Sequence, residues 1–549
     1  RAFAADFSPN QNPATTFFLN SHYQQKSLIC SRSIMPFSTL FQTLPQSLPG
    51  WVLLLIAVIP CLTVIFKLKA ISTSPLNQYP GPWLARYTNL WRLFVVRGGS
   101  YHLEIKKLHD EFGPVVRIGP NTLDLDFPGL KNTLYNRYDN WKKTPFYHNN
   151  STLVNGQIVY HMFSTTDEKE HTKMRRPIGR YFTMTSVLAF EPQMNIVIQL
   201  FCDILSKRFA IPGTACKLDE WIGYYSWDLN GRALSSRGFD YMTQGLDHDN
   251  TMHLADKALD YFAQVGQMPW LDRLLDKNPI VRIGPPNLTT VATIAQERLQ
   301  ARLEGKDTNF NQGVPDFLQY FTECVEDKGA IINYIILVLL AGADTTAITI
   351  RAVFYYVLRH PEAHKKLVDE ILSADLDIVP SYQDAKNLPY LNAVVREAMR
   401  MHPGVCMLLE RYVPEGGLQL PGNKFVPAGT AVGINPYVVG RNKEVWGLDA
   451  DVFRPERWLQ GVNEDFSAFQ ERLRQYKAAD LTFGAGKRDC IGKNLANLEI
   501  YKVVATMFRR FRFKLLDPVE DWEVTSSWFA RQKGGLTCSI TERRTEAKA

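Results

Sequence analysis

The run from Phe483 to Gly492 (FGAGKRDCIG) places one cysteine, Cys490, between glycines and a strongly helical stretch from Lys493 to Phe511. The N–H groups of a helix's first turn and the positive end of its dipole favour an anionic sulfur, and glycines let further amides approach it. Such a thiolate can bind iron. Taken without its neighbours, one cysteine in a large protein is more often a buried structural residue.

A second chemical signal is the segment from Ala341 to Thr346 (AGADTT), inside an otherwise apolar helix expected from about Ile331 to Leu358. Glycine in a helix interior costs about 1 kcal/mol relative to alanine, and Asp and Thr side chains compete with the backbone for hydrogen bonds. The alternatives are a plain helix distortion or part of a second membrane span. The uncharged run from Tyr334 to Ala343 is too short to cross a bilayer.

Two charged pairs stand at helical spacing. Glu397 and Arg400 are three residues apart, which alone describes a solvated ion pair worth about 0.2–0.5 kcal/mol. His171 and Arg175 are four apart, so they share one helix face, as many exposed pairs do. Neither pair indicates a function by itself.

The elements that must position these residues are mostly helices, because apolar residues recur at helical spacing along much of the chain. Strand-like runs are short and few. The sequence therefore predicts a fold that is mainly α with a small β portion. The expected helices cover 101–112, 167–182, 190–209, 288–305, 330–359, 362–373, 384–401 and 492–510, and the expected strands cover 115–118, 122–125, 425–426 and 431–434.

The 549 residues include 45% apolar and 21% charged residues, which excludes a disordered or fibrous chain. The net charge of +7 is small for this length and is not clustered, so nucleic-acid binding is not expected. The eight cysteines are far apart in sequence, which argues against a disulfide framework and against a zinc site.

The N-terminal region predicts a membrane attachment. The first methionine is Met35, a candidate start, and residues 1–48 are interpreted as a disordered or artefactual leader. An uncharged run from Trp51 to Phe66 predicts a transmembrane anchor over 49–70, with a cleaved signal peptide and a core helix as alternatives. The lysines that follow it favour a cytoplasmic body. A proline-rich hinge is expected over 71–83 and one folded domain over 84–549.

The run around Cys490 resembles the haem-ligating signature of the cytochrome P450 superfamily, the haem-thiolate monooxygenases. The other motifs follow in that family's order, and the resemblance spans roughly residues 79 to 540. Two further runs, 113–121 and 265–272, are similar to fungal members of the pisatin demethylase-like group. The resemblance implies a role in secondary metabolism.

The resemblance also implies a cofactor, haem b, with the Cys490 thiolate as axial ligand. Asp344 and Thr345 would relay protons to dioxygen. Glu397, Arg400 and Arg457 would form a buried structural network. The remaining cofactor contacts are assigned to Phe483, Arg488, His171, Arg175, Arg411, Gly486 and Gly342.

The implied reaction inserts one oxygen atom of O₂ into an apolar small molecule, a terpenoid or polyketide, with electrons from NADPH. The implied partner is the diflavin NADPH–cytochrome P450 reductase, with cytochrome b5 as a further candidate, at the endoplasmic reticulum membrane. The basic residues that could meet an acidic reductase, or be merely solvated, are Lys142, Lys143, Lys173, Arg176, Lys487, Lys493 and Arg509. The substrate pocket is assigned to Leu337, Leu340, Ala341, Val405, Met407, Leu408, Trp528 and Phe529.

Two other classes of function remain open. A haem-thiolate isomerase or peroxide-using enzyme would need no external electrons, and a haem sensor would need no chemistry. Both have less need of the acid and alcohol at Asp344 and Thr345, so these residues favour the monooxygenase.

Overall fold

The computed structural model describes residues 71–543 except 139, 155, 285–288 and 311–313, together with residues 58, 59, 62, 65, 69 and 70. The leader expected over 1–48 lies outside the described residues, and so does most of the anchor expected over 49–70. From Ile71 onward the chain forms one unit, and the fold is described for that unit.

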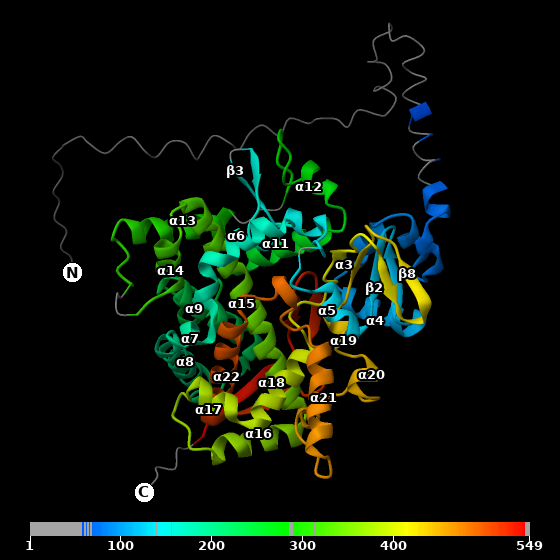
Figure 1. Ribbon diagram of the computed structural model, residues 1–549. Coiled ribbons are helices and arrows are strands. Elements are labelled where there is room, and N and C mark those ends of the chain that lie inside the picture. Colours follow the sequence, from blue (N-terminus) through cyan, green and yellow to red (C-terminus); the bar gives the residue numbers. More distant parts are fainter. Residues whose placement is uncertain are drawn as a thin grey trace, which may run out of the picture. The chain divides into compact units, whose positions relative to one another are not determined.

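Helices dominate this unit, as expected from the sequence, and the strands β2 and β8 gather at one side of it beside α3 and α4 (Figure 1). The helices are α3 (Leu90–Arg97), α4 (Tyr101–Phe112), α5 (Lys131–Leu134), α6 (Glu168–Ile178), α7 (Met184–Leu188), α8 (Glu191–Leu205), α9 (Leu218–Ser235), α10 (Tyr241–Gln244), α11 (Thr251–Val265), α12 (Trp270–Leu274), α13 (Thr289–Leu303), α14 (Phe317–Cys324), α15 (Lys328–Arg359), α16 (Pro361–Ser373), α17 (Tyr382–Asn387), α18 (Pro389–Met401), α19 (Pro436–Val439), α20 (Lys443–Trp446), α21 (Phe466–Ala479) and α22 (Lys493–Arg510).

The strands form small sheets. The largest has the order β1-β2-β9-β6, in which β2 runs parallel to β9 and the other neighbours are antiparallel. A second sheet has the order β10-β13-β5, and three strand pairs complete the set. The strands are β1 (Val115–Gly119), β2 (Thr122–Leu125), β3 (Thr152–Val154), β4 (Gln157–Val159), β5 (Cys216–Lys217), β6 (Arg411–Tyr412), β7 (Leu418–Leu420), β8 (Lys424–Val426), β9 (Ala431–Gly433), β10 (Phe511–Leu515), β11 (Glu523–Ser526), β12 (Ala530–Lys533) and β13 (Thr537–Glu542).

Helix α15 forms the centre of the main core. It begins where the Asp327 side chain accepts a hydrogen bond from the N–H of Gly329, and it ends before Pro361, which cannot continue a helix. Within the described part of the chain, α15 is the one helix long and apolar enough to span a membrane, but 56% of its most apolar window is buried inside the protein. Because it packs against α9, α18 and α22, α15 is a core helix of this unit.

The structure also differs from the sequence-based expectations. The helix expected over 384–401 is broken in two, because Pro389 starts α18 and restricts Leu388 before it to an extended conformation. Helices α9 and α11 and the strands after Arg510 were not expected. In the segment expected as a hinge, Leu76 and Tyr79 are buried against the sheet, so this stretch is docked on the body.

Candidate active site

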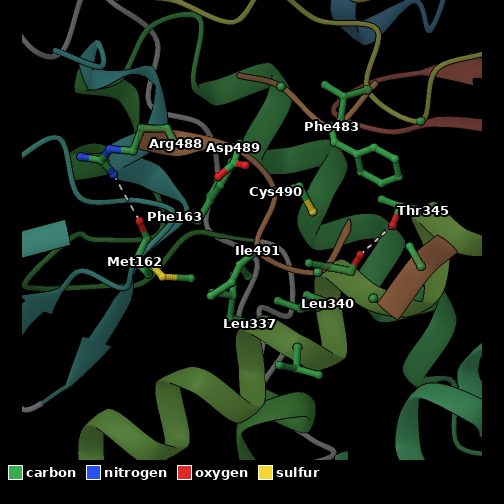
Figure 2. A pocket seen from close by; sticks show the side chains of 18 of the residues that line it. Met162, Phe163, Leu337, Leu340, Thr345, Phe483, Arg488, Asp489, Cys490 and Ile491 are labelled. Atoms are coloured by element: carbon green, nitrogen blue, oxygen red, sulfur yellow. Dashed lines mark hydrogen bonds between the residues drawn. The ribbon is translucent and has the colours of Figure 1, made fainter. Parts of the chain in front are cut away.

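A cavity of about 330 Å³ lies between α15 and the loop that leads into α22. Figure 2 shows Leu337, Leu340 and Thr345 of α15 and Phe483, Cys490 and Ile491 of that loop among its walls. The walls are mostly apolar, as in pockets that hold small molecules and cofactors. Two segments separated by more than a hundred residues in sequence therefore meet at one site.

The loop before α22 is shaped by two glycines. Gly484 and Gly486 have φ values of +66° and +71°, a conformation that favours glycine. A Cβ on Gly486 would lie only 2.1 Å from the carbonyl oxygen of Tyr135, so this glycine lets two backbone segments pack closely. The N–H of Cys490 donates to the carbonyl of Phe483 at 2.9 Å, which closes the loop and fixes the cysteine.

The Cys490 side chain lines the cavity, so the residue keeps accessible surface although it lies inside the protein. Burial raises the pKa of its thiol, while the N–H of Gly492 and the charges of Arg175 and Lys493 act in the opposite direction. The start of α22 favours a thiolate, and burial acts against it. A metal that replaces the thiol proton would offset this burial penalty.

Basic side chains line another part of the cavity. His171 and Arg175 come from α6, Arg411 from β6 and Arg488 from the loop before α22. Lys143, expected on a basic surface, is instead buried in this wall, where its Nζ donates to the carbonyl of Phe163 at 2.6 Å.

The basic groups in this wall outnumber the acidic groups that pair with them. Among the described residues, neither Arg411 nor Lys143 forms an ion pair, and the pKa of Lys143 is lowered by burial and by the charges of Arg488 and Arg411. The Nδ1 atom of His171 is buried without a partner, and burial and nearby cations lower the pKa of His171 to about 3. Such a wall fits an anionic group, such as the carboxylates of haem, so the residues present fit that cofactor.

Two of the predicted cofactor contacts are engaged by protein groups. Arg488 pairs with Glu168 at the start of α6 at 2.9 Å and donates to the carbonyl of Thr165 at 2.9 Å. Arg175 pairs with Asp489 at 2.7 Å. Both arginines line the cavity while tying α6 to the cysteine loop, so they fix the relative position of these two segments.

The middle of α15 is held in an unusual arrangement. Thr345 donates to the carbonyl of Ala341 at 2.8 Å, and Thr346 donates to that of Gly342 at 2.9 Å. Asn230 of α9 donates to the carbonyls of Val338 and Leu339 at 3.1 and 3.3 Å. A Cβ on Gly342 would lie 2.5 Å from the Asn230 side chain, so this glycine makes room for the asparagine. Helix α15 is continuous through this segment, and Gly342 lets Asn230 of α9 pack against it.

Asp344 forms no salt bridge with any described residue. Trp227 of α9 donates to its Oδ1 at 2.8 Å, and its Oδ2 is buried without a partner. Burial raises the pKa of Asp344, and the Trp227 hydrogen bond and the charges of Arg531 and Arg351 counteract this rise. Asp256 of α11 pairs with Arg531 at 3.2 Å, and burial together with the charge of Asp344 raises its pKa to about 7. Asp256 can therefore hold a proton near neutral pH, and the pKa of Asp344 is shifted in the same direction.

The charged network around Glu397 is brought together as the sequence predicted. Arg400 donates to both oxygens of Glu397 at 2.9 and 2.7 Å, and Arg457 donates to one of them at 2.8 Å. The N–H of Arg454 and the indole of Trp458 add two further donors at 2.9 Å. Burial would raise the pKa of Glu397, but these partners hold it below its usual value. The carboxylate is therefore a fixed negative charge.

Most residues assigned to the substrate pocket line the cavity, and two do not. Met407 and Leu408 are packed in the core behind its wall. Sequence analysis missed Asn230, Glu499 and Phe163, which line it, and Trp227, which orients Asp344. Asn230 and Trp227 belong to α9. This helix is buried on nearly all sides, so it lacks the amphipathic pattern that identifies surface helices. The assigned residues found in the wall are Leu337, Leu340, Ala341, Val405, Trp528 and Phe529.

A mainly helical fold fits a haem-thiolate protein when its cysteine loop faces an apolar cavity and its basic wall includes Arg411 and Lys143, which form no ion pair with a described residue. A sequence model described as Cytochrome P450 matches residues 80–538. The chain is 43% identical to Cytochrome P450 monooxygenase cfoH of Aspergillus candidus, over 84% of this chain and 88% of the relative. It is 34% identical to cicH and to pkfB of Emericella nidulans, both named Cytochrome P450 monooxygenase, over 83% and 88% of this chain and 91% and 93% of those proteins. The chain belongs to the cytochrome P450 family and is a monooxygenase.

Proposed function

We propose that this protein hydroxylates or epoxidises an apolar small molecule of fungal secondary metabolism, a terpenoid or polyketide. For a hydroxylation, substrate C–H, O₂, NADPH and one proton give the alcohol, NADP⁺ and water. The observation that supports this most directly is that the Cys490 and Thr345 side chains line one apolar cavity. A sulfur that could hold the haem iron and a hydroxyl that could pass a proton thereby line the same cavity.

Haem b, when bound, supplies the activation of dioxygen. The Cys490 sulfur would hold its iron, and Arg411 and Lys143 would meet its carboxylates. Asp344, whose Oδ2 has no hydrogen-bond partner among the described residues, would hold a proton, and the hydroxyl of Thr345 would pass it into the cavity. The aliphatic side chains of α15 would exclude water from the reacting carbon.

The electrons would come from a diflavin NADPH–cytochrome P450 reductase, with cytochrome b5 as a second donor. The side chains of Lys173, Arg176 and Lys493 are exposed and could meet an acidic partner, whereas Lys143 is buried and could not. A single anchor before residue 71 would hold the catalytic domain on the cytosolic face of the endoplasmic reticulum.

The test uses the full chain co-expressed with a diflavin reductase and supplied with NADPH. Cys490→Ser should abolish the thiolate-type Soret band of the reduced carbon monoxide complex, whereas Cys324→Ser, at a half-buried thiol away from the cavity, should keep it. An unchanged band in Cys490→Ser would overturn the ligand assignment. Turnover with peroxide alone would support the peroxide-using alternative, and an isomerised product without NADPH consumption would support the isomerase. Ligand-induced spectra without any product would support a sensor.

A further inference from the structure

One wall of the cavity is built of aromatic rings. Tyr147, Phe163 and Trp528 line it, and the ring centroids of Phe163 and Trp528 lie 5.4 Å apart in a T-shaped contact. Tyr147 contacts both rings, at 5.5 and 6.0 Å. Edge-to-face contacts of this kind add specific attraction beyond the burial of area, so the three rings hold one another in place.

Two further rings lie behind this wall. Phe262 of α11 packs on Trp528 at 5.2 Å and on Phe163 at 5.8 Å, and Phe146 packs on Trp528 at 5.8 Å. Phe146 and Phe262 are buried and do not line the cavity. The aromatic wall is therefore supported by rings from two separate segments of the chain and is pre-organised for a ligand.

The same wall carries hydrogen-bond donors that no described residue uses. No acceptor within the described ranges pairs with the indole Nε1 of Trp528 or with the amide nitrogen of Asn150, and both residues line the cavity. The amide oxygen of Asn150 is occupied, because His161 Nε2 lies 2.9 Å from it. Burial and the charge of Lys143 lower the pKa of His161 to about 4, and its Nδ1 accepts from the N–H of Phe163, so the remaining proton sits on Nε2.

The part of the cavity formed by α15 is different in kind. Apart from Tyr334, whose hydroxyl already donates to the carbonyl of Met174, its side chains there are aliphatic or small, including Leu337, Leu340 and Ala341. They can contact any apolar ligand and distinguish little between ligand classes. The discrimination must therefore come from the aromatic wall and its free donors.

We propose that the substrate is a planar aromatic compound carrying a carbonyl or hydroxyl oxygen, as in aromatic polyketides. Its ring packs on Phe163 and Trp528, and its oxygen accepts a hydrogen bond from the Trp528 indole or the Asn150 amide. A saturated terpenoid hydrocarbon would leave those donors unpaired and would gain nothing from the ring quadrupoles. This inference rests on the proposed function, because it concerns the substrate of the same site.

The test compares three probes of similar shape on the purified holoprotein: acetylnaphthalene, ethylnaphthalene and the fully saturated acetyldecalin. Dissociation constants are read from the ligand-induced shift of the haem Soret band. Acetylnaphthalene should bind at least about fivefold more tightly than either of the other two, although both of these are more hydrophobic. Equal or tighter binding of acetyldecalin would overturn the aromatic preference, and so would the absence of a shift with all three probes.

Two variants separate the ring from the donor. Phe163→Leu should weaken both naphthalenes more than acetyldecalin, because the aromatic contact with the ligand is lost together with the contact between the ring and the Lys143 ammonium. Trp528→Phe keeps a ring but removes the N–H, so it should weaken acetylnaphthalene about fivefold and spare ethylnaphthalene. Trp270→Phe is the matched control, since Trp270 is 56% exposed and lies outside the cavity. Equal effects of Trp528→Phe on both naphthalenes would overturn the donor role.

These outcomes are distinguishable from a failure of the proposed function. Each variant is first checked for the thiolate-type band of its reduced carbon monoxide complex. Loss of that band in the unmodified protein would contradict the haem-thiolate assignment itself. An intact band together with a preference for acetyldecalin would contradict the substrate class alone.

Discussion

Two buried acids on neighbouring helices are treated in opposite ways by this fold. Glu397 of α18 accepts five hydrogen bonds from Arg400, Arg454, Arg457 and Trp458. Asp344 of α15 accepts one, from Trp227, and its second oxygen is buried without a partner. The first acid has its pKa lowered and the second has its pKa raised, although burial pushes both upward.

The difference separates an acid that holds the fold from an acid that can hold a proton. Glu397 connects α18 with the segment that contains Arg454 and Trp458, so its negative charge is part of the architecture. Asp344 is not needed to neutralise Arg531, because Arg531 already pairs with Asp256 and Asp260. A carboxyl left incompletely paired in a protein core is a candidate for proton transfer. The comparison therefore predicts different responses to removal of each charge.

The largest effect is expected from Glu397→Ala. It leaves the Arg400 and Arg457 guanidinium groups buried without their carboxylate, which should lower the free energy of unfolding by about 3–5 kcal/mol. Urea unfolding of the holoprotein, followed by far-UV circular dichroism, measures this loss. Glu415→Ala, at an exposed acid, should stay within about 0.5 kcal/mol of the unmodified protein. A loss below about 1 kcal/mol for Glu397→Ala would contradict the structural role.

A third buried acid extends the comparison. Glu499 of α22 lines the cavity and forms no ion pair with a described residue. Burial raises its pKa from 4.5 to about 8, although a hydrogen bond with Thr346 acts to lower it. Between pH 4.5 and about pH 8, Glu499 keeps its proton in the folded protein but has lost it in the unfolded protein. The free energy of unfolding should therefore fall as the pH rises through this range.

Glu499→Gln tests this pH dependence. The glutamine cannot ionise, so the variant should gain about 3 kcal/mol relative to the unmodified protein between about pH 5.5 and about pH 7.5. Unfolding free energies at a series of pH values provide the measurement, and Glu415→Gln should show no such gain. Parallel stability curves for Glu499→Gln and the unmodified protein would mean that Glu499 ionises normally.

The sequence predicted the fold class from local apolar spacing, whereas the Glu397 network, whose Arg457 is 60 residues from Glu397, was implied only by the resemblance. The apolar residues at helical spacing form α15, and Glu397 and Arg400, three residues apart, pair with each other on α18. The contacts of this part of α15 could not be predicted, because Trp227, which donates to Asp344, and Asn230, which donates to the carbonyl of Val338, lie on α9, more than a hundred residues upstream. Burial on nearly all sides of α9 removes the periodicity that reveals a helix.

Lys143 illustrates a second limit. A sequence shows that a residue is charged but not whether it is buried. Lys143 was therefore grouped with other basic residues as a surface that could meet a partner protein. In the structure Lys143 is buried above the rings of Tyr147 and Phe163, at 3.7 and 4.3 Å from their centroids. Its apolar stem and the aromatic rings determine that position, and both contacts are long-range in sequence or depend on loop conformation.

A smaller effect is expected from Trp227→Phe. The ring remains, but the indole donor to Asp344 is lost, so the carboxyl has no protein donor left. We expect the free energy of unfolding to fall by about 1–2 kcal/mol and the pKa of Asp344 to rise further. Urea unfolding beside Trp270→Phe measures the first effect, since the half-exposed Trp270 makes no such hydrogen bond. Identical stabilities of the two variants would show that the hydrogen bond contributes nothing.

The smallest effect on stability is expected from Asp344→Asn, and it is the sharpest test of the comparison. An asparagine keeps an oxygen that accepts from Trp227 and resembles the protonated carboxyl in shape, while Arg531 retains Asp256 and Asp260. The free energy of unfolding should therefore change by less than about 1 kcal/mol, whereas Glu397→Gln, the same chemical change on α18, should cost several times more. Urea unfolding of both variants, with peroxide release per NADPH for Asp344→Asn, separates stability from proton transfer. If Asp344→Asn destabilised the protein as much as Glu397→Gln and left peroxide release unchanged, Asp344 would be a structural acid, and the distinction between the two regions would be lost.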